Sequence, residues 1–243
     1  MSEKRSLEVC AFNIQSAIIA ENAGAVRVEL CDSPLEGGTT PSYGVIRRVR
    51  EKVNLQLYPI IRPRSGNFFY DDDEFGIMLR DVVVARELGC DGVSTGISRI
   101  DGHIDTDRLK KIVDIAYPMQ VTCHRVFDSA PDPFRALEEI IDCGCERILT
   151  SGQKAKAAEG AALLRQLIEK SGERIVIMPG SGVRSGNIPM LIAETGAREF
   201  HTSARRLAED PVLWHNPAIG DNGEVYIADR EELDAIMRAL ALE

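Results

Sequence analysis

The chain has 243 residues, of which 44% are hydrophobic and 28% are charged. This length and balance suit one compact domain with a large core. The formal net charge of -9 argues against a nucleic-acid-binding surface, because binding to the phosphate backbone depends on a basic surface. We therefore predict no nucleic-acid partner, although local anion sites stay compatible with this charge.

The sequence has no run that approaches the roughly 20 apolar residues of a membrane span. Its first residues, MSEKRSLEVC, lack the apolar region of a signal peptide. We expect a cytoplasmic protein with no membrane partner. The six cysteines are irregularly spaced, which fits reduced thiols better than a disulfide framework.

A similar phrase occurs four times along the chain, at residues 22–30, 87–95, 142–150 and 194–202. In each phrase, a helical tail passes through a glycine into a short apolar strand. Glycine suits this junction because it accepts positive φ at the C-terminus of a helix. Four more apolar segments predict the remaining strands, at residues 6–12, 55–63, 119–127 and 174–180.

Amphipathic helical segments lie between the strands, and residues 71–89 and 131–144 carry the acids or prolines typical of helix N-termini. Eight strands that alternate with helices predict a (β/α)8 TIM barrel, formed as a single domain by residues 1–243. A doubly wound open sheet is the alternative. The last repeat is irregular, because residues 206–228 are polar and contain glycine and proline before a final helix at 229–242.

A TIM barrel places its functional residues at the carboxyl ends of the strands. Polar and thiol side chains gather at these positions: Cys10, Glu29, Cys31, Arg62, Arg64, His124, Arg125, Asp128, Thr150, Ser151, His201 and Ser203. Successive side chains of a strand point to opposite faces. We therefore expect Arg27, Glu29 and Cys31 to face the barrel axis. On the fifth strand, His124 faces inward and Cys123 packs outward.

Eight motifs occur in order along nearly the whole chain: VELC, EGGTTPSYGV, IRPRSGNFFY, DGHID, HRVFD, ILTSG, MPGSGV and EFHTSA. In this order they resemble the CutC family, whose members are named for copper homeostasis. The resemblance implies a cytoplasmic TIM-barrel protein associated with copper handling, with Cys10 and Cys31 as candidate Cu(I) ligands. The segment after Arg206 is shorter and differently composed than the family pattern leads us to expect.

Cys10 and Cys31 are expected on adjacent strands, which lie roughly 4.8 Å apart. Their thiolates would then meet at the mouth of the barrel. Soft thiolate ligands favour Cu(I) over hard cations, so copper(I) is the one metal or cofactor that we expect. The alternative is that both cysteines fill core space, as free cysteines do in many proteins.

An anion site is the second expectation. The loops after strands seven and eight commonly bind phosphate in TIM barrels, and these loops contain Gly180, Gly182 and Ser203. Arg62 and Arg64 add guanidinium groups, which bind carboxylate or phosphate with two hydrogen bonds. The alternatives are a tight glycine turn and internal ion pairs.

An acid–base site is the third expectation. His124, Glu29 and Asp128 combine an imidazole that titrates near neutrality with carboxylates that could orient it. Isomerases, lyases and hydrolases all use such sets. The alternative is a polar layer in which these groups only bridge strands and loops.

We therefore predict a copper homeostasis protein that binds Cu(I). The alternative is an enzyme that acts on a small phosphorylated or carboxylated metabolite, so the partner is a copper ion or a small anionic metabolite. A scaffold with broad apolar patches is a third class. Phe68, Phe69 and Tyr70 either wall the pocket or form a subunit contact, and the second role would make the protein a homo-oligomer.

Overall fold

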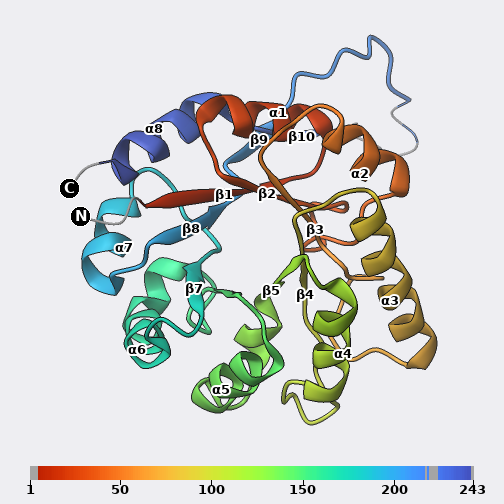
Figure 1. Ribbon diagram of the computed structural model, residues 1–243. Coiled ribbons are helices and arrows are strands. Elements are labelled where there is room, and N and C mark those ends of the chain that lie inside the picture. Colours follow the sequence, from red (N-terminus) through yellow and green to blue (C-terminus); the bar gives the residue numbers. More distant parts are fainter. Residues whose placement is uncertain (1–4, 217, 219–223, 242–243) are drawn as a thin grey trace.

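The structure is a computed structural model that describes residues 5–216, 218 and 224–241. Within this part of the chain, eight parallel strands form a ring that helices surround, as Figure 1 shows. The strands of the ring are β1 (Ser6–Ala11), β2 (Arg27–Leu30), β3 (Gln56–Pro59), β4 (Gly92–Thr95), β5 (Gln120–Cys123), β6 (Arg147–Thr150), β7 (Val176–Pro179) and β8 (Glu199–Thr202). The helices are α1 (Ile14–Ala23), α2 (Tyr43–Arg50), α3 (Asp72–Glu87), α4 (Thr106–Ala116), α5 (Pro133–Cys143), α6 (Ala161–Ser171), α7 (Ile188–Thr195) and α8 (Arg230–Leu240), with short 3-10 helices η1 (Arg125–Ser129) and η2 (Ala157–Gly160). This is the predicted (β/α)8 barrel.

The strands of the ring are hydrogen-bonded in two arcs. One arc has the order β3-β2-β1-β8 and the other the order β4-β5-β6-β7. The arcs meet where Ile60 and Ser94 form a parallel bridge, beside which the amide of Ile61 donates to the carbonyl of Ser94 at 2.7 Å. At the other junction, a Cβ added to Gly180 after β7 would lie 3.4 Å from the His201 side chain on β8. The closed ring rules out the alternative of an open sheet.

The helix termini follow the signals in the sequence. α3 begins with a capping box, in which the Asp71 side chain accepts from the amide of Glu74 at 2.8 Å and the Glu74 side chain accepts from the amide of Asp71 at 3.1 Å. α1 and α5 end at Gly24 and Gly144, with φ values of 91° and 87°. These glycines are two of the predicted junctions, and each returns the chain to the next strand.

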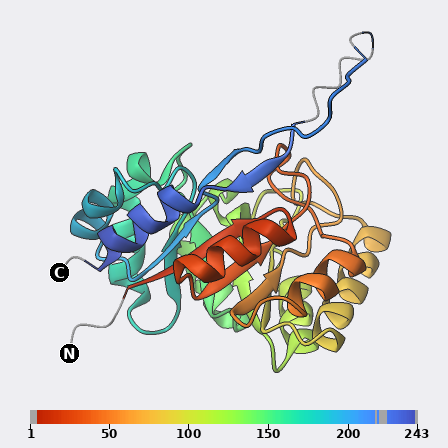
Figure 2. The same ribbon diagram turned by 90° about the horizontal axis from the view of Figure 1, so that it is seen from above.

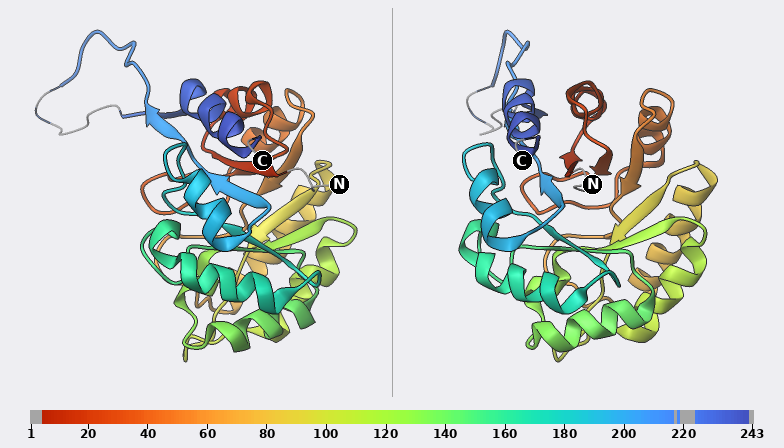
Figure 3. Two further views of the ribbon diagram at one scale, coloured as in Figure 1. Left: turned by 90° about the vertical axis from the view of Figure 1, so that its left-hand side faces the viewer. Right: turned by 60° about the vertical axis from the view of Figure 1, so that its left-hand side comes forward.

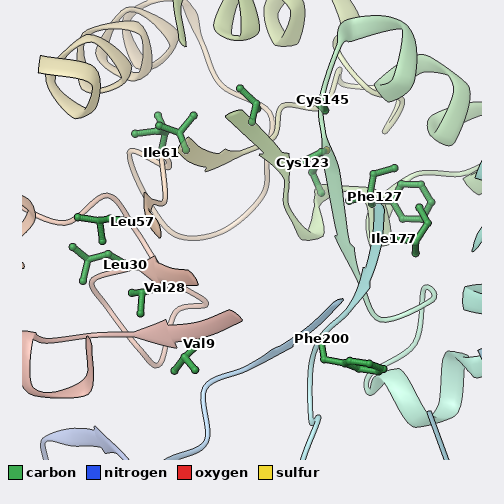
Figure 4. Close-up of a cluster of buried hydrophobic side chains, with 14 of the residues drawn as sticks. Val9, Val28, Leu30, Leu57, Ile61, Cys123, Phe127, Cys145, Ile177 and Phe200 are labelled. Atoms are coloured by element: carbon green, nitrogen blue, oxygen red, sulfur yellow. The ribbon is translucent and has the colours of Figure 1, made fainter. Parts of the chain in front are cut away.

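The main hydrophobic core lies between the strands and the helices. Outward-pointing strand residues fill it, and Val9, Val28, Leu57 and Phe200 are fully buried there (Figure 4). Cys123 belongs to the same core, as strand alternation predicts. The hydrophobic core thus lies on the outer side of the strands, and side chains that point into the barrel can be polar.

A layer of buried charges fills the barrel beneath its mouth. Arg27 on β2 donates to Glu8 on β1 and, at 2.5 Å, to Glu199 on β8. Arg147 on β6 also donates to Glu199, at 2.9 Å. Both guanidinium groups lie near the ring of Tyr58, at 5.2 and 5.8 Å from its centre. Buried ions are tolerated when they are paired in this way, and the layer forms the floor of the site.

β5 ends earlier than the sequence predicts. We expect strand character to residue 127, but β5 ends at Cys123 and η1 follows. His124 causes the turn, because its Nδ1 atom accepts from the amide of Val126 at 3.2 Å and thereby caps η1. The same contact fixes the orientation of the imidazole.

The last repeat contains an antiparallel ribbon, formed by β9 (Arg205–Leu207) and β10 (Tyr226–Ala228). Between them, residues 208–216 lead away from the barrel (Figure 2). The predicted irregular segment 206–228 is thus partly a two-stranded ribbon, and its residues 217 and 219–223 lie outside the described part of the chain. α8 follows and packs beside α1 and α7 (Figure 3). Every helix among the described residues is too short or too polar to span a bilayer.

Candidate metal and ligand-binding site

Two cysteines and a carboxylate meet at the carboxyl ends of β1 and β2. Cys10 lies opposite Glu29 in the parallel register, and Cys31 follows β2 directly. The two sulfur atoms are 3.6 Å apart, and the Cys31 sulfur lies 3.6 Å from Oε2 of Glu29. All three side chains are buried, and one donor atom from each lies within 4.8 Å of the others. The structure thus brings together the two cysteines that the sequence analysis paired.

This donor set fits a soft metal ion. The sulfur separation of 3.6 Å exceeds the length of a disulfide bond, about 2.05 Å, and both cysteines are free thiols. One ion with two bonds to sulfur of about 2.3 Å can join sulfur atoms that lie up to about 4.6 Å apart, so a separation of 3.6 Å is compatible with one ion held by both cysteines. Thiolates select Cu(I) or Zn(II) over hard cations, and Glu29 supplies a third donor on the same side.

His201 on β8 connects the cysteine pair to the ionic layer. Its Nδ1 atom lies 2.6 Å from Oε1 of Glu8, and its Nε2 atom lies 3.7 Å from Oε2 of Glu29. Burial alone lowers the pKa of His201, but hydrogen bonds with Cys10 and Glu8 and the charges of Glu29 and Glu8 raise it well above its usual range. The raised pKa favours the imidazolium form of His201 beside the Glu8 carboxylate.

The loop between β2 and α2 covers Cys31. Gly38 in this loop has a φ of 90°, and an added Cβ would lie 3.2 Å from the Cys31 sulfur. Arg62 holds the loop, because its Nη1 atom donates to the carbonyls of Glu36 and Gly38 at 2.9 and 2.7 Å. Its Nη2 atom donates to the carbonyl of Gly66 at 2.8 Å. One guanidinium thus fixes the loops after β2 and β3 over the mouth.

A cavity of about 390 Å³ opens at the mouth of the barrel. Cys10, Glu29, Arg62 and His124 line it from the ends of four strands, and Ser203 lines it from the loop after β8. This volume lies in the range of small-molecule sites. Because Cys10 lines the cavity, the cavity also gives access to the cysteine pair.

The His124 imidazole is neutral in this setting. Burial, followed by the positive charge of Arg62, lowers its pKa to about 3. Because Nδ1 accepts from the amide of Val126, the proton lies on Nε2, which has no partner in the described part of the chain. The expectation of an imidazole that titrates near neutrality is thus replaced by an N–H donor at the cavity.

Three of the five predicted anion-binding residues line the cavity, namely Arg62, Gly182 and Ser203. Arg64 points elsewhere, because its guanidinium donates to the Glu74 carboxylate at 2.5 Å and holds the loop before α3. The amide of Gly180 donates to the carbonyl of Thr150 at 3.0 Å. Arg64 and Gly180 therefore stabilise loops of the fold and do not line the cavity.

Asp128 serves the loop after β6. Its carboxylate accepts from the Thr150 hydroxyl at 2.6 Å and from the amides of Ser151 and Gln153 at 3.1 Å. It also pairs with Arg125 at 2.7 Å. These contacts use the acceptor positions of the Asp128 carboxylate, and Asp128 does not line the cavity. Of the three predicted acid–base residues, His124 and Glu29 do line it.

Of the three aromatic residues after β3, Phe68 lines the cavity and lies 4.9 Å from the His124 ring, centre to centre. Tyr70 is buried, whereas Phe69 is exposed. Phe68 thus takes the predicted role of a pocket wall. The homo-oligomer stays a prediction.

His201, Arg184 and Arg205 also line the cavity. The sequence predicts His201 at the carboxyl end of the eighth strand and the Arg205 guanidinium at the anion site, whereas Arg184 has no predicted role. Strand alternation was sufficient to find His201, which has the inward parity of Glu199 on the same strand. Arg184 and Arg205 follow the ends of β7 and β8, where alternation no longer fixes the direction of a side chain.

A larger hollow of about 660 Å³ lies at the opposite end of the barrel. It is lined by residues that precede or begin strands, among them Ser6, Glu146 and Glu173. In TIM barrels this end contributes to stability, while active sites lie at the carboxyl ends of the strands. We therefore place the functional site at the mouth.

The fold and the mouth together define a TIM-barrel protein with a buried cysteine pair beside a carboxylate. The profile of the CutC family matches residues 5–206, and the chain belongs to this family. A family protein CutC from Chromobacterium violaceum is 49% identical over 88% of this chain and 87% of its own length. Another, from Salmonella newport, is 44% identical over 90% of this chain and 88% of its own length.

Solved structures agree with this placement. A CutC protein from Streptococcus agalactiae, named for copper homeostasis, is 33% identical and has a TM-score of 0.78, covering 82% of this chain and 98% of its own. A phosphoribosylanthranilate isomerase from Thermotoga maritima has a TM-score of 0.60 at 12% identity, covering 97% of this chain and 98% of its own. The second likeness shows the shared barrel fold alone.

Proposed function

We propose that this protein takes part in copper homeostasis by binding one Cu(I) ion between Cys10 and Cys31. The observation that carries the proposal is the 3.6 Å separation of two buried sulfur atoms, with Glu29 beside them. Two thiolates select a soft ion. Copper homeostasis is also the role in the name of the Streptococcus agalactiae relative.

The surroundings suit a cargo ion that must enter and leave. Cys10 lines the cavity, whereas Cys31 lies behind it under Gly38. Copper would therefore reach Cys10 first and then Cys31. The thiols must stay reduced for this purpose, so the proposal places the protein in the cytoplasm.

A competition titration with the Cu(I) chelator bathocuproine disulfonate, on reduced protein without oxygen, tests the proposal. We expect one tightly held Cu(I) per chain, because both sulfurs serve the same ion. Either Cys10→Ala or Cys31→Ala removes one of two soft ligands and should abolish tight binding. Zn(II) is titrated in parallel, since two thiolates and a carboxylate also suit that ion.

Cys90→Ala is the matched control, because Cys90 is buried in the outer core, away from the mouth. The control should bind Cu(I) as the unaltered protein does. Equal Cu(I) binding by the Cys10→Ala, Cys31→Ala double variant would refute the proposal, as would a Zn(II) affinity that exceeds the Cu(I) affinity.

A further inference from the structure

The cavity contains polar atoms that copper binding would leave without a partner. His124 and Glu29 are 3% and 4% exposed. Each has one side-chain atom without a partner among the described residues, Nε2 of His124 and Oε1 of Glu29. The first is a donor and the second an acceptor. Buried polar atoms are almost always hydrogen-bonded, so the two atoms together call for a ligand that both accepts and donates.

Arg62 brings a positive charge to the same cavity. Its side chain lies 4% exposed, and its guanidinium donates only to neutral carbonyl groups within the described residues. The Tyr70 hydroxyl is a further neighbour and is also neutral, since burial raises its pKa although Arg62 partly offsets the rise. A buried cation without a counter-ion is costly. An anionic ligand would supply the counter-ion.

The lining as a whole favours anions. It contains four arginines and one acidic residue: Arg62, Arg125, Arg184, Arg205 and Glu29. Arg125 is paired with Asp128 at 2.7 Å, so three arginines remain against one carboxylate. The complete chain has a net charge of -9, so the positive lining is a local departure from the balance of the protein. Such a cleft focuses the electrostatic field and attracts small anions.

The loops after β7 and β8 provide free backbone donors. Ser181, Gly182 and Ser203 line the cavity, and their backbone amides have no acceptor in the described ranges. Ser181 and Gly182 both have positive φ, 75° and 69°, and this conformation is costly for the serine. These two loops are the place where TIM barrels bind phosphate. Together with the unpartnered His124 and Glu29, they make the cavity a built site.

We propose that the cavity binds a small phosphorylated hydroxy acid. The phosphate lies at the amides of Ser181, Gly182 and Ser203, the carboxylate accepts from Arg62 and His124, and the hydroxyl donates to Glu29. Each unsatisfied group then has a partner of the right polarity, and a cavity of about 390 Å³ suits a ligand of this size. The proposal goes beyond copper binding and adds a second ligand to the protein.

Calorimetric titration of the reduced, copper-free full chain tests the proposal with three probes. 3-Phosphoglycerate carries all three groups, 3-(phosphonooxy)propionate has the same length and lacks only the hydroxyl, and inorganic phosphate lacks both the hydroxyl and the carboxylate. We expect affinity to fall in that order, by about tenfold for each lost group, because each removes a hydrogen bond to a charged partner.

Substitutions at the two ends test the orientation of the ligand. His124→Ala should weaken 3-phosphoglycerate about tenfold or more and leave inorganic phosphate less affected. Arg184→Gln should weaken all three probes, because it removes a positive charge from the phosphate end of the cavity. His103→Ala and Arg206→Gln are matched controls outside the cavity lining, and circular dichroism checks that each variant is folded.

The outcomes are decisive in both directions. Absence of saturable binding of every probe in the millimolar range would overturn the proposal. Equal affinity for inorganic phosphate and 3-phosphoglycerate would overturn the assignment of Arg62, His124 and Glu29. A control variant that weakens binding as much as the cavity variants would show non-specific attraction. None of these outcomes bears on the copper titration, which uses different ligands and substitutions.

Discussion

The thiol of Cys31 donates to Oε2 of Glu29 at 3.6 Å, while Oε1 of the same carboxylate has no partner among the residues described. One side chain thus joins the cysteine pair to the cavity. The copper ion and the organic anion would share Glu29, and the two ligands should therefore influence each other.

We expect Cu(I) and 3-phosphoglycerate to weaken each other's binding. One Cu(I) ion that binds both cysteines displaces two thiol protons into solvent. The net charge of the site therefore falls by one, and a nearby anion binds less tightly. By linkage the effect is reciprocal, and we expect about fivefold or more in each direction. Calorimetric titration of 3-phosphoglycerate with and without bound Cu(I) measures it. Equal affinities would contradict a shared site, and the Cys10→Ala, Cys31→Ala double variant is the control.

The affinity for Cu(I) should rise with pH. Burial, followed by the contact with Cys10 and the charge of Glu29, raises the pKa of Cys31 well above its usual range. At neutral pH this thiol is protonated, so Cu(I) must displace its proton. We expect the affinity to increase by about tenfold per pH unit for that proton, with the rise continuing beyond neutrality.

Competition titrations at several pH values, referred to the chelator's own constants at each pH, measure this slope. A flat profile through neutrality would show that Cys31 is already a thiolate, or that it is not a ligand.

Gly38→Ala should weaken Cu(I) binding. Its Cβ would lie 3.2 Å from the Cys31 sulfur, which leaves too little room for the sulfur to shift towards an ion. Gly37→Ala is the matched control, because it shares the positive φ but its Cβ would meet only Arg62, at 3.6 Å. Each substitution should cost about 1–2 kcal/mol of stability through backbone strain. If both variants lose copper equally, the effect belongs to the loop and not to Cys31.

We expect the free energy of unfolding to decrease in acid because Glu8 becomes protonated. Burial alone would raise its pKa, but its contacts with His201 and Arg27 lower the value from 4.5 to about 2. A lowered pKa stabilises the fold above the unfolded-state value, and this contribution is lost as the pH falls from about 4.5 towards about 2. Urea unfolding at a series of pH values measures the loss.

Glu8→Gln should flatten the curve in that window. It should also destabilise the protein by about 3–5 kcal/mol, because it removes one partner of a buried ion pair. Glu51→Gln, on the surface of the chain, is the control and should leave the curve nearly unchanged. A Glu8→Gln variant with the same acid profile would show that other carboxylates cause the acid sensitivity.

The sequence was sufficient to predict which strand side chains point into the barrel and which point outward. Alternation alone predicted that Glu29 and His124 face the cavity, that Cys31 lies beside Cys10 and Glu29, and that Cys123 packs in the outer core, because a strand leaves its side chains only two directions. The repeated helix–glycine–strand phrase likewise predicted the barrel. Local periodicity encodes both features, and no distant contact is needed to read them.

The partners of long or loop-borne side chains could not be read in this way. Arg62 donates to carbonyls of two loops, and Arg64 turns to Glu74, although both stand at the end of β3. The Asp128 carboxylate accepts hydrogen bonds from Thr150 and Ser151 at the end of β6. Such choices depend on how separate loops fold over the mouth, and strand periodicity contains no information about them.

The central claim is that one Cu(I) ion is bonded to both Cys10 and Cys31. X-ray absorption at the copper edge, on reduced protein loaded with one equivalent of Cu(I), tests it most directly. We predict two sulfur neighbours for each copper, and the loss of both in the Cys10→Ala, Cys31→Ala double variant. A shell made only of nitrogen and oxygen, or a spectrum that the double variant reproduces, would contradict the claim.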